Sequence, residues 1–483
     1  MPDHVVICGG GIIGVATAYY LTLQGIKPLL VEKTGIACAA SGKAGGFLAL
    51  DWTDELARTS YSLHRELAMT LDADIGYRPV QSLALSATAL KRGSSRQRSA
   101  KLPDWLDGSV SGGQVLGNVQ TTAQVHPEKL TKAMMAAAEM RGAQVRSGTV
   151  ESISSSEGPA AKVTGVIVDG ELIQADAVVL ALGPWTNTLA SSLQLPHISG
   201  QLGHSLVLKP STSEALPADC LFVSWQSKSG KVSEPEIFVR ADGTVWCCGE
   251  NKMVNPPEDP LQVKPCSGAS AAIQEVAKEL SSHLDSAEVV QQQACIRPLS
   301  PDGSPVIGQH PYVAGAYIAT GHSCWGILNG PATGKALAEM IATGASQCVD
   351  LTPYDPARLI RKTDGVRRKE RLIECERTHL ADREPIADLS STPTWLMALQ
   401  SRIRPGSKHR LSSTSLAKRI CVSVTQLRCP AADPIGRASY LRQPSLKTRT
   451  HGTNANGEGQ RNVAGTAHQE ILTSKTETAT TCW

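Results

Sequence analysis

Residues 4–33 read HVVICGGGIIGVATAYYLTLQGIKPLLVEK, and this stretch decides the fold expected for the chain. The apolar run over residues 5–8 predicts a buried strand, and the glycine turn after it opens a helix that reaches to about Gln24. A second strand is predicted over residues 28–31, directly before an acidic residue. Strand, glycine turn, helix and strand in this order predict a βαβ unit whose turn faces a ligand.

The three spaced glycines of this turn indicate a dinucleotide site. Gly9 allows the tight turn, Gly11 lets the backbone approach a pyrophosphate, and Gly14 lets the helix pack closely on the strand. The helix N-terminus would direct its free N–H groups at the phosphates, and Glu32 would accept a hydrogen bond from a ribose hydroxyl. The alternative is a glycine-rich turn in an unrelated βαβ unit.

Composition and charge exclude several classes of protein. The 483 residues carry a net charge of +3, from 47 basic and 44 acidic side chains, so we expect no nucleic-acid partner. The 13 cysteines form no CxxC motif or Cys/His cluster, so we expect no metal site and no disulfide framework. No apolar run is long enough to span a bilayer, and the first strand begins too early for a targeting segment. We therefore expect a cytoplasmic protein without a membrane span.

The middle of the chain continues an open α/β sheet. A helix is predicted from Pro127 to its stop at Gly142, and a strand follows at once. The continuous apolar run over residues 177–182 is typical of a central parallel strand covered on both faces. It ends at Gly183, next to Trp185, where such a sheet would bind its ligand.

A second, mostly antiparallel sheet is predicted over residues 206–246, where apolar and polar residues alternate. Ser270 could cap the helix expected after it, which would reach about Leu284. Further on, Asn329 is expected to open another helix that closes at Gly344 and whose N-terminus can also face the ligand.

Residues 361–483 differ in character. They are basic, rich in Ser, Thr and Arg, and lack periodic apolar residues, so we expect a disordered tail. A functional basic arm and an extension from read-through of noncoding sequence are the two explanations.

Four sequence blocks occur in a defined order. They are CGGGIIGVATAYYL with VEK, then ASGKAGG, then ADAVVLALGPW, and finally IRPLSPDGSPVIG followed by ATGHSCWGILNGPATG. Over residues 4–358 the chain thereby resembles the D-amino-acid oxidase-like family of FAD-dependent oxidoreductases, which includes glycine oxidase and sarcosine oxidase. It looks nearest to the poorly characterised eukaryotic members. An NAD dehydrogenase would need only the first block.

The resemblance implies an α/β fold in which a Rossmann-type FAD-binding domain carries an antiparallel-sheet (α+β) substrate domain. Both belong to one module over residues 1–360. The FAD-binding segments are expected at about 1–50, 125–200 and 290–360, and the substrate-domain segments at about 51–124 and 201–289.

The resemblance also implies which residues hold FAD. Those near the ADP half, the pyrophosphate and the middle of the cofactor would be Gly9, Gly11, Ile12, Gly14, Glu32, Lys33, Ser41, Gly42, Val150, Gly183 and Trp185. Those near the isoalloxazine would be Gly321, His322, Gly326, Ile327 and Leu328, where the helix N-terminus stabilises negative charge on the reduced ring.

Arg297, in the R-P motif, is the residue implied to grip a substrate carboxylate, since a guanidinium donates two parallel hydrogen bonds and stays charged. The alternative is that Arg297 forms an ion pair with an internal acid such as Asp302. The implied reaction oxidises the C–N bond of a small-molecule amino acid or secondary amine. A hydride moves to flavin N5, water hydrolyses the imine, and O2 or another acceptor takes the electrons.

Weaker candidates remain beside these. His322 and Lys43 could hold positive charge for oxygen reduction, or the histidine could simply bond within its turn. Cys324 could bind flavin covalently or be an ordinary buried cysteine. Four tryptophans could wall a pocket or lie in the core, namely Trp52, Trp225, Trp246 and Trp325. The alternative functions are an FAD-binding protein with a non-catalytic assembly or trafficking role, and a nucleic-acid-modifying enzyme.

Overall fold

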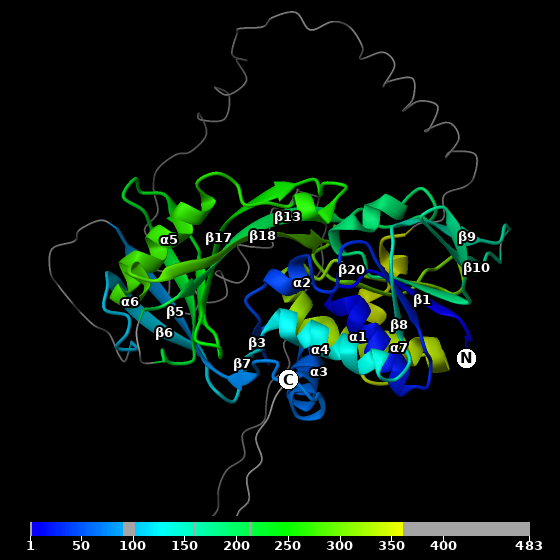
Figure 1. Ribbon diagram of the computed structural model, residues 1–483, viewed down its shortest axis with the longest axis horizontal. Helices are drawn as coiled ribbons and strands as arrows, with labels where there is room; N and C mark the ends of the chain where they lie inside the picture. The colour runs from blue at the N-terminus through cyan, green and yellow to red at the C-terminus, as the bar shows by residue number, and fades with distance from the viewer. Residues whose placement is uncertain (1, 90–101, 159, 212–214, 361–483) are drawn as a thin grey trace, which may run out of the picture. The chain divides into compact units, whose positions relative to one another are not determined.

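The computed structural model describes residues 2–89, 102–158, 160–211 and 215–360 (Figure 1). The tail predicted over residues 361–483 lies outside these ranges. Two large sheets organise the described part of the chain, one with six strands and one with eight. None of the helices in these ranges is both long and apolar enough to cross a membrane.

The six-stranded sheet has the order β19-β20-β12-β1-β2-β8, and only β19 runs antiparallel to its neighbour. The carboxyl ends of β1, β2, β12 and β20 therefore meet at one edge, as expected of an open α/β sheet. Its strands are β1 (Val5–Cys8), β2 (Leu29–Glu32), β8 (Gln144–Ser147), β12 (Ala177–Leu180), β19 (Val306–Gln309) and β20 (Ala316–Thr320).

Both faces of this sheet are covered, which explains its continuous apolar strands. Val5 and Ile7 pack among the helices α1 (Ile12–Leu23), α4 (Pro127–Glu139) and α7 (Gly326–Thr343), which lie together in Figure 1. Val6 and Cys8 face the opposite way. They pack toward a small sheet of β9 (Val150–Ser155), β10 (Val163–Val168) and β11 (Glu171–Gln174).

Small residues bring α7 close to α1. A Cβ on Gly334 would lie 2.4 Å from the carbonyl carbon of Ala16, and one on Gly330 would lie 2.7 Å from Ile12 Cγ1. Helix α7 begins at Gly326, three residues before the predicted Asn329, and ends before Gly344, whose φ of +92° is the expected left-handed cap.

The eight-stranded sheet has the order β18-β13-β17-β16-β14-β5-β6, with β15 paired to β14. It is mostly antiparallel, as predicted, but β14 pairs with β5 in parallel. Its strands are β5 (Gln81–Thr88), β6 (Val110–Gly117), β13 (Ser199–Lys209), β14 (Asp219–Gln226), β15 (Val232–Ser233), β16 (Glu236–Val239), β17 (Val245–Val254) and β18 (Glu288–Leu299).

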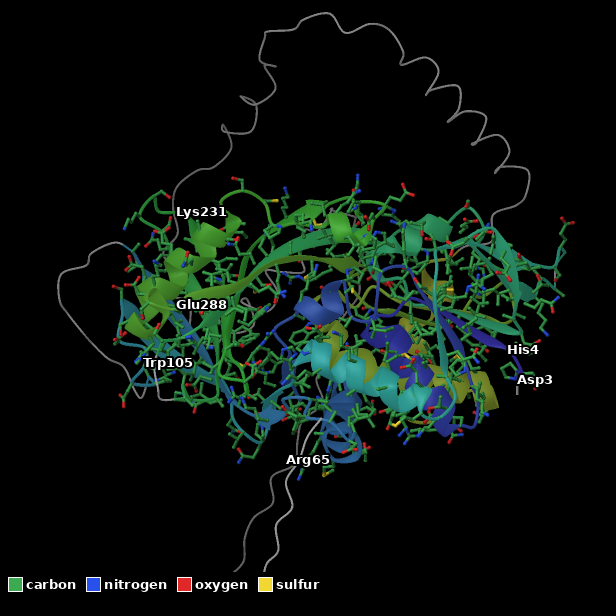
Figure 2. All side chains as sticks on the ribbon, in the orientation of Figure 1. Asp3, His4, Arg65, Trp105, Lys231 and Glu288 are labelled. Atoms are coloured by element: carbon green, nitrogen blue, oxygen red, sulfur yellow. The ribbon has the colours of Figure 1, made fainter. Side chains whose placement is uncertain are left out.

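Helices α5 (Ala269–Leu280) and α6 (Ser282–Asp285) cover one face of the eight-stranded sheet (Figure 1). The cap predicted at Ser270 is wrong, because Gly268 in a left-handed conformation precedes α5 and no side chain caps it. Trp105 closes this end of the core and donates its Nε1–H to Asp219 Oδ2 at 3.1 Å. In Figure 2, Trp105 lies at the opposite side of the described region from His4, which precedes β1.

The remaining elements join the two large sheets. Helix α3 (Glu55–Thr70) is capped by Asp54, and its apolar residues pack in the core around α7 rather than against the second sheet. Helix α2 (Ala40–Lys43) follows β2. A third small sheet contains β3 (Phe47–Ala49), β4 (Arg78–Pro79) and β7 (Thr122–Gln124). We propose that the two large sheets mark the two domains, so that α3 joins the first and β18 the second.

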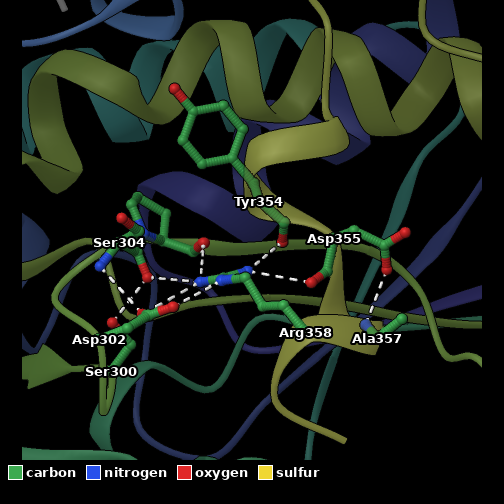
Figure 3. A network of polar contacts seen from close by, with 8 residues as sticks. Ser300, Asp302, Ser304, Tyr354, Asp355, Ala357 and Arg358 are labelled. Carbon is green, nitrogen blue, oxygen red and sulfur yellow. Dashed lines mark hydrogen bonds and ion pairs between the residues drawn. The ribbon is translucent and has the colours of Figure 1, made fainter. Parts of the chain in front are cut away.

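Arg358 fastens the end of the described chain onto the loop before β19 (Figure 3). Its guanidinium donates two hydrogen bonds to the Asp302 carboxylate, at 2.7 and 3.3 Å. It also donates to the carbonyl oxygens of Ser304 and Pro305, at 2.8 and 2.7 Å, and to that of Tyr354. Asp302 is therefore paired with Arg358, and the ion pair considered between Arg297 and Asp302 does not form.

Candidate active site

A cavity of about 750 Å³ lies between the carboxyl ends of the six-stranded sheet and the inner face of the eight-stranded sheet. This volume falls in the upper part of the roughly 300–1,000 Å³ typical of small-molecule sites. Glu32 and Val150 line one end, and Phe222 and Arg297 line the other.

The loop after β1 forms a cradle for a phosphate group. Gly9 has a φ of +112°, and a Cβ there would lie 2.5 Å from the carbonyl oxygen of Ala181. A Cβ on Gly14 would lie 2.0 Å from the carbonyl oxygen of Gly9, so no larger residue fits where α1 packs on β1. The N-cap residue of helix α1 is Gly11, which has no side chain to cap the helix, and the first turn holds no acidic residue. Its N-terminus is therefore free to hold an anion.

Ser41 lies against this N-terminus. Its Oγ accepts a hydrogen bond from the N–H of Ile12 at 2.9 Å, which leaves the hydroxyl hydrogen for a phosphate oxygen. The Glu32 carboxylate accepts from the N–H of Gly10 at 2.6 Å and from the N–H of Thr34 at 2.8 Å. Glu32 Oε1 also accepts from the Thr34 hydroxyl at 2.9 Å and from the N–H of Gly35 at 3.3 Å, so the carboxylate is held in place and only Oε2 keeps a lone pair that can accept from a ribose. This end of the cavity thus fits a dinucleotide.

The other strands of the first sheet end in turns that line the middle of the cavity. Gly183, with a φ of +53°, follows β12, and its carbonyl oxygen accepts from the hydroxyls of Thr186 and Thr320 at 2.7 and 3.0 Å. Trp185 donates its Nε1–H to the carbonyl oxygen of Pro257 at 2.7 Å. The N-terminus of α7, which also has no side-chain cap, closes this part of the wall.

The structure brings most of the predicted site residues to this one cavity. It is lined by Gly9, Gly11, Ile12, Glu32, Lys33, Ser41, Val150, Gly183, Trp185, Arg297, His322, Gly326 and Ile327. Four predicted residues do not line it. Gly14 and Gly42 permit close backbone packing, Gly321 has a φ of +77° in the turn after β20, and Leu328 is buried in the core.

The inner face of the eight-stranded sheet forms the opposite wall. Phe222, Glu236 and Cys248 lie directly opposite one another on β14, β16 and β17, so their side chains share one face. Phe238 and Trp246 lie two residues along on the same face. Sequence reasoning missed Phe222, Glu236 and Phe238, because alternation shows that two faces differ but not which of them lines a site.

Aromatic rings crowd this wall. The chain has three phenylalanines, and all three line the cavity. Phe47 lies 4.9 Å from Trp52 and 5.1 Å from Phe222 between ring centroids, and Phe238 stacks on Trp246 at 5.3 Å. Trp225 and Trp246 are both buried in apolar clusters, so the core interpretation holds for these two, and Trp246 also lines the cavity together with Trp52 and Trp325.

Arg297 reaches into the cavity from β18. Its Nη2 donates to Asn251 Oδ1 on β17 at 2.6 Å, so the side chain crosses β13 above Gly203. A Cβ on Gly203 would lie 2.9 Å from that Nη2, so the glycine makes room for the crossing. Among the described residues, no carboxylate lies within ion-pair distance of Arg297. The guanidinium is thus free to bind an acid from solution.

Burial disfavours a positive charge on His322. Burial lowers the pKa of its imidazole to about 3, and its Nε2 lies 3.1 Å from Thr333 Oγ1. The hydrogen-bonding role in the turn is therefore favoured. Lys43 donates its Nζ to the carbonyl oxygen of Ala294 at 3.1 Å and lines the cavity, so it remains the candidate cation. Cys324 is not a buried cysteine, because its surface lines the cavity.

Comparison with known proteins agrees with this geometry. The family model of the FAD dependent oxidoreductases (DAO) matches residues 4–340, and the chain belongs to this family. A putative oxidoreductase of Schizosaccharomyces pombe is 32% identical, over 73% of this chain and 97% of the relative. A glycine oxidase of Pseudomonas putida is 26% identical, over 74% of this chain and 99% of the relative. The crystal structure of glycine oxidase from Bacillus cereus has a TM-score of 0.59 at 24% identity, and the match covers 75% of this chain and 99% of that one. The protein is thus an FAD-dependent oxidoreductase, and the predicted fold class and cofactor are confirmed.

Proposed function

We propose that the protein oxidises the C–N bond of an amino acid or secondary amine that carries a carboxylate. The observation that carries this proposal is Arg297, which enters the cavity from the second sheet without a carboxylate partner among the described residues. A guanidinium in a half-enclosed apolar site binds a carboxylate through two parallel hydrogen bonds. Similarity to glycine oxidases supports the amine class.

The chain's own residues would divide the work in a simple way. FAD, when bound, supplies the hydride acceptor. Arg297 would hold the substrate carboxylate and so orient the carbon next to the nitrogen. The aromatic wall around Phe47, Trp52 and Phe222 would exclude water. The N-terminus of α7 has no side-chain cap, so the free N–H groups of its first turn would stabilise negative charge that lies beside this helix end.

Anaerobic titration of the full-length holoprotein tests this function. The panel would contain glycine, proline, leucine and phenylalanine, both enantiomers of the last three, and their N-methyl derivatives. We expect at least one member to bleach the oxidised flavin spectrum. Arg297→Gln should then weaken reduction by that member about 100-fold while the bound FAD is retained, since a lost charge-assisted bidentate pair costs about 3 kcal/mol. If no member bleaches the flavin, the proposed oxidation of a carboxylate-bearing amine is wrong.

A further inference from the structure

Glu236 is the second charged side chain on the inner face of the eight-stranded sheet. It opens β16, pairs with Phe222 on one side and Cys248 on the other, and lines the same cavity as Arg297. Arg297 lies three strands away in sheet order but reaches back across Gly203 toward β17. Its guanidinium comes close enough to favour the charged form of Glu236. The cavity thus has a cationic and an anionic side chain on one wall.

The Glu236 carboxylate has unused acceptor capacity. Within the described residues, its one recorded hydrogen bond comes from the Cys248 thiol, whose Sγ lies 3.6 Å from Oε2. Thiols are weak donors, and no Lys, Arg or His side chain of the described residues lies within 4 Å of this carboxylate. A half-buried carboxylate beside aromatic rings is costly unless a cation or a proton joins it.

We propose that Glu236 binds the amino group of the substrate and accepts its proton, so that the substrate is a zwitterionic amino acid held between Glu236 and Arg297. This inference rests on the proposed oxidation of an amine. In the proton step, an N–H bond of the ammonium breaks and an O–H bond forms on Glu236. The bonding electrons stay on nitrogen as a lone pair, nothing is oxidised or reduced, and the proton later leaves to water.

The surroundings of Glu236 suit a proton acceptor. Burial raises the pKa of this carboxyl, although Arg297 and the Cys248 hydrogen bond oppose the shift. A raised pKa brings a carboxylate nearer to the range in which it exchanges protons at neutral pH. The titratable groups that interact with it come from four elements and are Cys220 on β14, Cys248 on β17, Arg297 on β18 and Cys324 beside α7. Burial raises the pKa of the Cys220 and Cys248 thiols, so they stay neutral and do not compete for the proton.

Matched pairs of ligands distinguish the contribution of Glu236 to binding from that of Arg297. Each amino acid would be compared with the acid that lacks its amino group, namely glycine with acetate, leucine with 4-methylpentanoate and phenylalanine with 3-phenylpropanoate. Apparent Kd values for the amino acids come from anaerobic rapid-mixing flavin reduction. Kd values for the acids come from perturbation of the oxidised flavin spectrum, and the thermal midpoint of the holoprotein with each acid provides a readout that needs no turnover.

Glu236→Gln keeps the volume and the contact with Cys248 but removes the charge. We expect the apparent Kd for the amino acids to rise at least 10-fold, while the Kd for the acids changes less than 2-fold or falls. The rate of flavin reduction should also become more dependent on rising pH, because the amine must now lose its proton to solvent. Glu236→Asp should restore part of the binding. Glu275→Gln, at an exposed carboxylate on α5 that does not line the cavity, is the control and should leave the Kd values for both ligand classes within 2-fold of the wild type.

Two outcomes would overturn the inference. One is that Glu236→Gln weakens the affinity for the amino acid and for its matched acid by the same factor. The other is no loss of either, with an unchanged pH profile. Failure of the wild-type protein to be reduced by any amino acid would instead contradict the proposed function, so the two failures are distinguishable.

Discussion

His64 on α3 donates its Nε2–H to the carbonyl oxygen of Ile327 at 3.0 Å, with Leu328 sharing the bond at 3.1 Å. The carbonyl oxygen of Ile327 needs this donor because Pro331, four residues later in α7, has no N–H to form the usual helical hydrogen bond with it. One turn before His64, Ser60 Oγ accepts from the N–H of Ala332 at 3.0 Å. Helix α3 therefore supplies hydrogen-bond partners for the backbone groups that lack them in the first turn of α7. This turn lines the candidate active site.

The first prediction concerns the stability provided by this contact. His64→Ala removes a fully buried side chain and leaves the carbonyl oxygen of Ile327 without a donor, so we expect a loss of about 3 kcal/mol in the free energy of unfolding. Chemical denaturation of the holoprotein, followed by flavin release, measures it. His197→Ala, at an exposed histidine, should change stability by less than about 0.5 kcal/mol. Equal effects of the two variants would contradict the role given to His64.

The second prediction is a loss of stability in mild acid. Burial lowers the pKa of His64 to about 4 and that of His322 to about 3, whereas both groups titrate near 6.5 when unfolded. Protonation then favours the unfolded chain. Stability is greatest above pH 6.5 and falls as the pH drops toward 4, by about 1.4 kcal/mol per pH unit for each histidine.

His64→Gln tests this dependence because the amide retains an N–H donor but does not titrate near neutral pH. The thermal midpoint of the variant should fall less steeply with pH than that of the wild type between pH 6.5 and 4. An unchanged slope would show that His64 is already protonated in the folded protein or is not buried in solution.

The third prediction concerns the network of Arg358. Its side chain is only 21% exposed and bridges a carboxylate and several carbonyl oxygens, so Arg358→Ala should cost about 2 kcal/mol of stability. Arg146→Ala removes a more exposed arginine, which is paired with Glu171, and should cost less than about 1 kcal/mol. Denaturant unfolding of both variants gives the comparison. A similar cost for the two would mean that Arg358 does not anchor the end of the module.

The cofactor end of the site could be predicted from local sequence because each part depends on near neighbours. Gly9 and Gly14 are required by the turn itself, and Glu32 lies at the end of the very next strand. Arg297 could be assigned only through the resemblance, and its contact with a substrate carboxylate stays a prediction. Glu236 could not be identified, since nothing near it in sequence indicates that its face of β16 lines the cavity on the same wall as Arg297 of β18. The start of α5 was misplaced because a positive φ at Gly268, rather than a serine side chain, ends the preceding loop.

The last prediction separates the two faces of β14, where neighbouring residues have different tasks. Phe222 points into the cavity and contacts Phe47 and Trp52, whereas Val223 is buried in the core on the opposite face. Phe222→Ala should lower kcat/KM for leucine or phenylalanine about 10-fold more than for glycine. Loss of one apolar contact with the substrate side chain weakens discrimination between large and small substrates by about 1 to 2 kcal/mol. Val223→Ala should instead lower the thermal midpoint and leave the ratio of kcat/KM values unchanged. A uniform loss for all substrates in Phe222→Ala would show that this ring supports the fold or the cofactor rather than the substrate side chain.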